Sequence, residues 1–137
     1  MRGKRIAFDY GDVRTGVAVC DPDGILASPL TVLQSQKADF LDQILKLLKE
    51  NEPIEIFVGL PVNMSGTSGE SANKVSQFVD QLRTITEVKI SLIDERLSTV
   101  SAQKKLKEAG VSSRGSKHLI DAMAAVAILE QGLARNG

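Results

Sequence analysis

A hairpin near the N-terminus constrains the fold of this chain more than any other feature. The pattern predicts short strands at 5–9 and 16–20, joined by a turn that carries glycines. The first strand is apolar without alternation, which is typical of a strand covered on both faces. Asp9 ends it, so a carboxylate is expected where a buried strand reaches solvent. Gly11 and Gly16 give the turn backbone freedom and leave room for a ligand close to the main chain.

The role of Asp9 stays open at this point. A carboxylate beside a glycine-bearing hairpin fits a metal ligand or part of a phosphate cradle. It also fits a side chain that only satisfies the amides of a turn. The segment alone does not separate these interpretations.

Composition narrows the class of protein. A chain of 137 residues is long enough for one core, so a single domain over 1–137 is expected. The single cysteine, Cys20, and the single histidine, His118, exclude an internal disulfide, a cysteine zinc site and a histidine cluster. No apolar run approaches the length of a membrane span, which predicts a soluble, cytoplasmic protein without membrane contact. The 17 basic and 17 acidic residues balance, so any nucleic-acid binding would depend on a local basic patch.

The rest of the chain alternates between helical and extended patterns, which predicts an α/β fold. Its first three strands should form an antiparallel meander within a mixed five-stranded sheet flanked by helices. Pro29 favours an edge or bulged position in the third strand, and Gly59 is expected at the turn that ends the fourth. The expected elements after the hairpin are a turn at 21–24, a strand at 25–33, a helix at 37–51, a strand at 54–60, a helix with Thr67 and Glu70 as its capping box, a strand at 88–93, a helix from Ser98 or Thr99 to Ala109 and a helix from Ser116. The many alanines of the last helix imply close packing against a sheet.

Carboxylates from several elements are expected to meet at one edge of the sheet. Asp9 ends the first strand, Asp94 and Glu95 end the last, and Asp121 lies near the start of the last helix. Clustered carboxylates repel one another unless a cation neutralises them, and oxygen ligands favour Mg²⁺ or Mn²⁺. Two such ions would activate a water and stabilise the leaving oxygen of a phosphodiester. The alternative is that each acid serves its own element, as in a contact between Asp121 and Lys117.

Basic and polar residues near these acids suit a phosphate substrate. The loop that contains Asn63 is polar and glycine-bearing, so it either closes over a nucleic-acid backbone or simply connects two elements. The basic candidates for substrate binding are Arg14, Arg96, Arg114 and Lys117.

Four motifs resemble the signatures of the YqgF/RuvX family. They begin at Asp9 (DYG, then RTGVA), Val58 (VGLPVNMSG), Asp94 (DERLST) and Lys117 (K, then DAMAA), and they span nearly the whole chain. The resemblance implies a ribonuclease H-like fold related to the RuvC Holliday-junction resolvases. It also implies a bacterial nuclease that matures the 5′ end of pre-16S rRNA.

The resemblance further implies which residues form the site. Its metal-binding acids would be Asp9, Glu95 and Asp121, with Asp94 as the alternative second ligand. The supporting positions would be Asn63, Arg96 and Lys117.

The leading hypothesis is therefore a divalent-metal-dependent endonuclease acting on structured RNA, with pre-16S rRNA as substrate. A close variant is a resolvase of four-way DNA junctions, which favours a homodimer over a monomer because a two-fold substrate needs two symmetric cuts. A second class is an RNA-binding ribosome assembly factor with little or no catalysis. A third is a nucleotide module of the actin or sugar-kinase type, suggested by the glycine hairpin, although those proteins enclose the nucleotide between two such domains.

Overall fold

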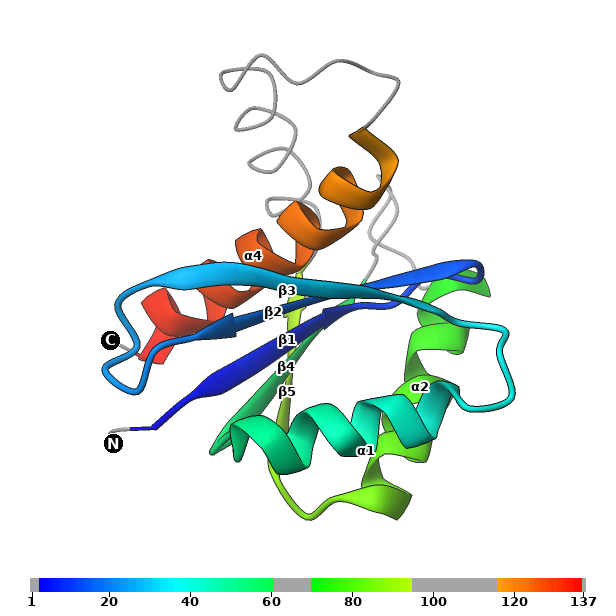
Figure 1. Ribbon diagram of the computed structural model, residues 1–137, viewed down its shortest axis with the longest axis horizontal. Helices are drawn as coiled ribbons and strands as arrows, with labels where there is room; N and C mark the ends of the chain where they lie inside the picture. Colours follow the sequence, from blue (N-terminus) through cyan, green and yellow to red (C-terminus); the bar gives the residue numbers. More distant parts are fainter. Residues whose placement is uncertain (1–2, 61–69, 95–115, 137) are drawn as a thin grey trace.

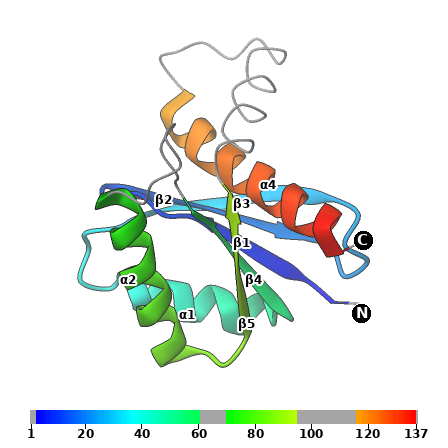
Figure 2. The same cartoon turned by 180° about the vertical axis from the view of Figure 1, so that it is seen from behind.

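The computed structural model describes residues 3–60, 70–94 and 116–136. Within these segments the strands are β1 Arg5–Asp9, β2 Arg14–Cys20, β3 Ala27–Gln34, β4 Glu55–Leu60 and β5 Lys89–Asp94. The helices are α1 Phe40–Asn51, α2 Glu70–Ile85 and α4 Ser116–Asn136. The strands form one sheet, with α4 on one face and α1 and α2 on the other (Figures 1 and 2).

The strand order of the sheet is β3-β2-β1-β4-β5. Strands β1, β2 and β3 pair antiparallel, whereas β4 pairs parallel with both β1 and β5. Parallel strands need crossover connections, and α1 and α2 provide them on the same face of the sheet. The predicted mixed five-stranded α/β sheet and its antiparallel meander are confirmed.

Alternation along β1 divides the core into two layers. Ile6 and Phe8 are fully buried in the cluster that includes residues of α1 and α2. Ala7, between them, belongs to the cluster on the other face, with Ala125 of α4. Since successive side chains of a strand point to opposite faces, this unbroken apolar run is explained by a strand covered on both sides.

Four aromatic rings gather at the centre of the α1/α2 layer. Phe78 of α2 stacks on Tyr10, with ring centroids 4.6 Å apart, and meets Phe8 edge to face at 5.8 Å. Phe40 of α1 lies 5.8 Å from Phe78 and 6.2 Å from Tyr10. The chain has only four phenylalanines and one tyrosine, so most of its aromatic surface is concentrated in this one cluster.

The alanine-rich α4 packs closely on its face of the sheet, as the sequence predicts. Ala124, Ala125 and Ala127 are buried, and Ile128 and Leu129 have no exposed surface. The helix contacts all five strands, and small side chains allow its backbone to come close to them. None of the helices in the described segments is long and apolar enough to cross a bilayer.

Replacing Gly132 of α4 by alanine is expected to destabilise the protein, although alanine normally favours a helix. A Cβ at this position would lie 2.7 Å from three ring carbons of Phe57, which is itself buried. Overpacking of this kind costs about 1–3 kcal/mol, against roughly 1 kcal/mol gained from helix propensity. Urea unfolding should show a net loss, while Ser76→Ala on the exposed side of α2 should change little. A net gain for Gly132→Ala would contradict the close packing of α4.

Two glycines expected in turns lie inside strands. Gly16 belongs to β2, which begins at Arg14, and Gly59 belongs to β4. The turn between β1 and β2 is therefore shorter than predicted, and Arg14 lies in a strand rather than in the turn. Glycine is common both at bends and where two backbones come close together, so the sequence pattern did not distinguish a turn from a strand at these positions.

The remaining boundaries differ for local reasons. β3 starts at Ala27 rather than residue 25, because the turn after β2 extends further: Asp21 accepts a hydrogen bond at Oδ1 from the amide of Ile25. Pro29 lies on an edge strand beside a bulge, as predicted. Cys20 is buried. The helix predicted to end at Ala109 falls outside the described residues.

Candidate active site

Two of the predicted acids lie at the carboxyl edge of the parallel strands. Asp9 is the last residue of β1, and Asp94 is the last residue of β5. β4 separates them, so with neighbouring strands roughly 4.8 Å apart the two strand ends lie about 10 Å from each other. The expectation that these two positions share one sheet edge is confirmed.

The two acids point to opposite faces of the sheet. Phe8 and Tyr10, on either side of Asp9, both pack in the α1/α2 layer, so alternation directs Asp9 to the α4 face. In β5 it is Ile93 that packs in the α4 layer, so Asp94 belongs to the α1/α2 face. A shared edge therefore does not bring the carboxylates of Asp9 and Asp94 together.

Glycines flank Asp9 on both sides. Asp9 pairs directly with Gly16 of β2. On the other side Phe8 pairs with Val58 of β4, and the next residues in that register are Asp9 and Gly59. The positions on either side of Asp9 on the α4 face therefore have no side chain. Of Gly16, Asp9 and Gly59, only the half-buried Asp9 has a functional group there.

The hairpin that follows Asp9 is tight. A Cβ on Gly11 would lie 2.6 Å from the carbonyl oxygen of Arg14, so only glycine fits this turn without a shift of the backbone. Arg14 is half-buried and pairs with Gln34 of β3. Gly11 therefore lies in the turn, as the sequence predicts. Arg14 lies at the same end of the sheet as Asp9.

Neighbouring elements hold this hairpin in place. Tyr10 stacks on Phe78 of α2. The carbonyl oxygen of Val13 accepts a hydrogen bond of 2.9 Å from the amide of Ser35, just beyond β3. Contacts from two other parts of the chain, α2 and the segment just beyond β3, thus fix the backbone directly after Asp9.

An ion pair between the hairpin and α2 was not predicted. Lys74 Nζ lies 2.7 Å from Asp12 Oδ2, and both side chains are partly exposed, at 39% and 55%. The two residues are 62 positions apart, so no local pattern in the sequence links them. Together with the stacking of Tyr10, this pair places the first turns of α2 beside the hairpin (Figures 1 and 2).

A buried acid at the opposite end of the sheet has a structural role. Glu55, at the start of β4, accepts a hydrogen bond of 2.6 Å from the hydroxyl of Ser91. Lys89 and Arg5 bring cations to 3.6 and 3.9 Å from its oxygens. Charged side chains are buried only with such partners, so this cluster joins the amino ends of β1, β4 and β5.

The other predicted site residues are placed only in part. Lys117 and Asp121 lie in the first turns of α4, as expected, and nothing further is described of their side chains. Across the segments the structure describes, no three histidine, cysteine, aspartate or glutamate side chains come close enough to share a metal ion. The predicted residues that fall outside these segments are Asn63, Glu95, Arg96 and Arg114.

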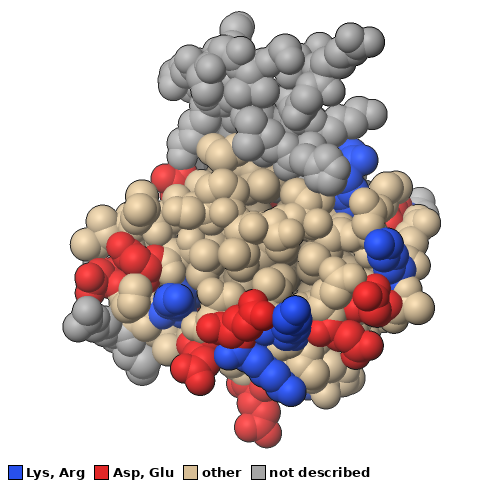
Figure 3. Space-filling model, in the orientation of Figure 1, with Lys and Arg blue, Asp and Glu red and all other residues tan. Residues whose placement is uncertain are grey.

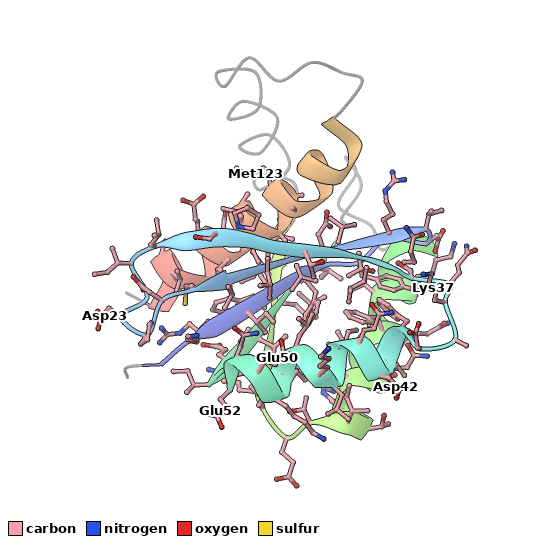
Figure 4. All side chains as sticks on the ribbon, in the orientation of Figure 1. Asp23, Lys37, Asp42, Glu50, Glu52 and Met123 are labelled. Carbon is pink, nitrogen blue, oxygen red and sulfur yellow. The ribbon has the colours of Figure 1, made fainter. Side chains whose placement is uncertain are left out.

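Charge is mixed on the face that carries α1 and β3. Basic and acidic side chains alternate there, with no single-sign patch among the described residues in view (Figure 3). Asp42, Glu50 and Glu52 lie along α1 and just after it, while Asp23 and Lys37 mark opposite ends of β3 (Figure 4). Lys37 belongs to the end that carries the hairpin, since Gln34 at the end of β3 pairs with Arg14. Met123 of α4 lies beyond the sheet from α1 (Figure 4).

The sheet order and the flanking helices give an α/β fold of the RuvC-like, ribonuclease H-like type. The structure of Thermus thermophilus RuvC in complex with a Holliday junction superposes with a TM-score of 0.65 at 20% identity, covering 98% of this chain and 96% of that one. Fowlpox virus resolvase superposes with a TM-score of 0.52 at 12% identity, covering 96% and 95%. At these identities the likeness concerns the fold alone.

The chain belongs to the RuvX family. The sequence profile described as "RuvX: Holliday junction resolvase" matches residues 3–135. A relative from Streptomyces avermitilis named "Putative pre-16S rRNA nuclease" is 46% identical over 134 residues, covering 96% of this chain and 86% of the relative. A relative of the same name from Mycolicibacterium smegmatis is also 46% identical, covering 94% and 79%.

Proposed function

We propose that this protein is a divalent-metal-dependent endonuclease that processes the 5′ end of pre-16S rRNA. Membership in the RuvX family and the names of relatives at 46% identity support the nuclease activity and the RNA substrate. The structural observation that carries the proposal is the position of Asp9. It ends a parallel strand at the carboxyl edge of the sheet, on the face of α4, with a glycine on each side.

Glu95, rather than Asp94, is the proposed second acid. Asp94 ends β5 on the α1/α2 face, away from Asp9. Glu95 is two residues after Ile93, which packs on the α4 face, so an extended backbone would give Glu95 the same face as Asp9. Glu95 is therefore favoured, although the spacing in the sequence left both acids possible.

Asp121 is the proposed third acid. It lies in α4 one helical turn before Ala125, a buried residue of the layer that packs on the sheet. Residues four apart share a helix face, so the position of Asp121 belongs to the side of α4 that meets the sheet. The proposed set thus comes from β1, the segment after β5, and α4.

This donor set fits Mg²⁺ or Mn²⁺. It consists of carboxylate oxygens alone, and the single cysteine is buried in a strand away from the carboxyl edge. A bound pair of such ions supplies an activated water and stabilises the leaving oxygen during phosphodiester hydrolysis. The proposed role of Asp9 is to place a negative charge at a fixed position. Its backbone is held by β1 on one side and by the hairpin on the other.

The substrate side of the proposal rests on basic and polar residues near this edge. Arg14 stands at the start of β2, at the same end of the sheet as Asp9. The other proposed contacts are Asn63, Arg96, Arg114 and Lys117. We take residues 1–137 as one nuclease domain that acts in the cytoplasm, where bacterial ribosomes assemble, as a monomer or a homodimer.

Resolution of four-way DNA junctions is the second candidate. It is favoured by the description of the family profile and by the fold shared with RuvC. That function requires a homodimer with two equivalent sites, because the substrate has two-fold symmetry. The same carboxylates would serve either substrate.

The choice between Glu95 and Asp94 gives a direct test of the proposed site. Glu95→Gln should lower the rate of Mn²⁺-dependent RNA cleavage by roughly 10²–10³-fold, because a metal-bound acid supports several kcal/mol of transition-state stabilisation. Asp94→Asn should stay within about threefold of wild type. The two substitutions make the same chemical change at adjacent positions, so each is the control for the other. Loss of cleavage in Asp94→Asn alone would reverse the assignment.

A further inference from the structure

The ion pair between Asp12 and Lys74 lies at the hairpin that follows Asp9, at the end of the sheet where β1 ends. Asp12 is three residues after Asp9, at the tip of the hairpin. Lys74 and Phe78 are one helical turn apart in α2, and both reach this hairpin: Phe78 through Tyr10 and Lys74 through Asp12. The same face of α2 therefore supports the hairpin that follows Asp9 and brings a cation to its tip, from the α1/α2 side of the sheet.

Both side chains of the pair are open to solvent. Lys74 Nζ is 2.7 Å from Asp12 Oδ2, yet 39% of one side chain and 55% of the other remain in solvent. Exposed ion pairs contribute little to folding stability, so breaking this contact costs the fold little. A phosphodiester offers Lys74 the same kind of partner as Asp12 does, an anionic oxygen.

We propose that Lys74 is a phosphate-binding residue for the nucleic-acid substrate, and that its ammonium group pairs with Asp12 when no substrate is bound. This inference rests on the proposed nuclease function and adds a contact from α2 to it. Asp12 holds the lysine beside the hairpin, and the substrate backbone displaces the carboxylate. Binding is then weakened by Asp12, through competition for Lys74 and through repulsion of the phosphate.

The proposal predicts opposite effects for the two partners. Lys74→Ala should weaken binding of a labelled pre-16S leader RNA by about 3–10-fold. It should also lower the slope of log affinity against log salt by about 0.7–0.9, the value of one lost phosphate contact. Asp12→Asn should tighten binding by about 2–5-fold at low salt. A pair that served only to fix the hairpin would weaken binding and lower the melting temperature in both variants.

The experiment is a fluorescence anisotropy titration in EDTA at several KCl concentrations, with thermal melts and Mn²⁺-dependent cleavage rates measured alongside. Lys49→Ala and Glu52→Gln, at the far end of α1, make comparable charge changes away from the hairpin and should behave as wild type. Opposite shifts for Lys74→Ala and Asp12→Asn, with unchanged melting temperatures, support the proposal.

Two results overturn the inference and can be told apart. If wild type binds and cleaves the RNA while both variants match the controls or weaken together, Lys74 is no phosphate contact, and the proposed function stands. If wild type neither binds nor cleaves the RNA, the proposed function fails, and the inference fails with it.

Discussion

Asp9→Asn is expected to abolish cleavage while leaving the fold intact. The substitution keeps the shape of the side chain at the end of β1 and removes the charge that the proposed metal site requires. A loss of at least about 10³-fold in rate corresponds to roughly 4 kcal/mol of transition-state stabilisation. The melting temperature should hardly change, since the proposed site would bring further carboxylates near Asp9 and the loss of one charge would relieve their repulsion. Cleavage rates and thermal melts of the same preparation give both quantities.

Asp23→Asn is the matched control for this prediction. It makes the same chemical change at the turn between β2 and β3, at the opposite end of the sheet (Figure 4). Its cleavage rate should equal that of wild type. An Asp9→Asn protein that cleaves at a wild-type rate would contradict the mechanism, because the proposed metal site depends on the charge at the end of β1.

Phe78→Ala is expected to cause the largest loss of stability. Phe78 is 1% exposed, and its ring contacts those of Tyr10, Phe8 and Phe40, which join β1, α1 and α2. Truncating a buried phenylalanine typically costs about 3–5 kcal/mol, and whole domains are stable by only about 5–15 kcal/mol. Urea unfolding should show this loss as a lower midpoint with an unchanged slope.

Two further variants locate the source of that effect. Phe78→Leu keeps most of the buried volume and should cost less than half as much. Ile25→Ala removes a side chain that is 81% exposed and should change the free energy of unfolding by less than about 0.5 kcal/mol. A loss below about 1 kcal/mol for Phe78→Ala would contradict the central place of the aromatic cluster.

The layered fold was predictable because its signals are local. The unbroken apolar run of β1 indicated a strand covered on both faces, and the alanines of α4 indicated close packing on a sheet. Likewise, a strand that ends in an acid predicted Asp9 at the carboxyl edge. Each of these inferences needs only periodicity, residue size and the position of a charge relative to an apolar run.

The unpredicted features depend on pairing between distant segments. Gly16 and Gly59 flank Asp9 only because of the register of β1 with β2 and β4, and a glycine by itself indicates a turn equally well. The contact of Lys74 with Asp12 depends on how α2 crosses the sheet. The face of Asp94 follows from which residues of β5 pack against α4, and the spacing of acids in the sequence does not contain that information.

The most direct test of the proposed function is cleavage of two labelled substrates side by side, a pre-16S rRNA leader and a synthetic four-way DNA junction, with Mg²⁺ or Mn²⁺. The proposed function predicts a cut at a defined position in the RNA by wild type, none by Asp9→Asn, and no symmetric cutting of the junction. Cutting of the junction alone would contradict it in favour of a resolvase. Binding of the RNA without any cutting would contradict it in favour of an assembly factor.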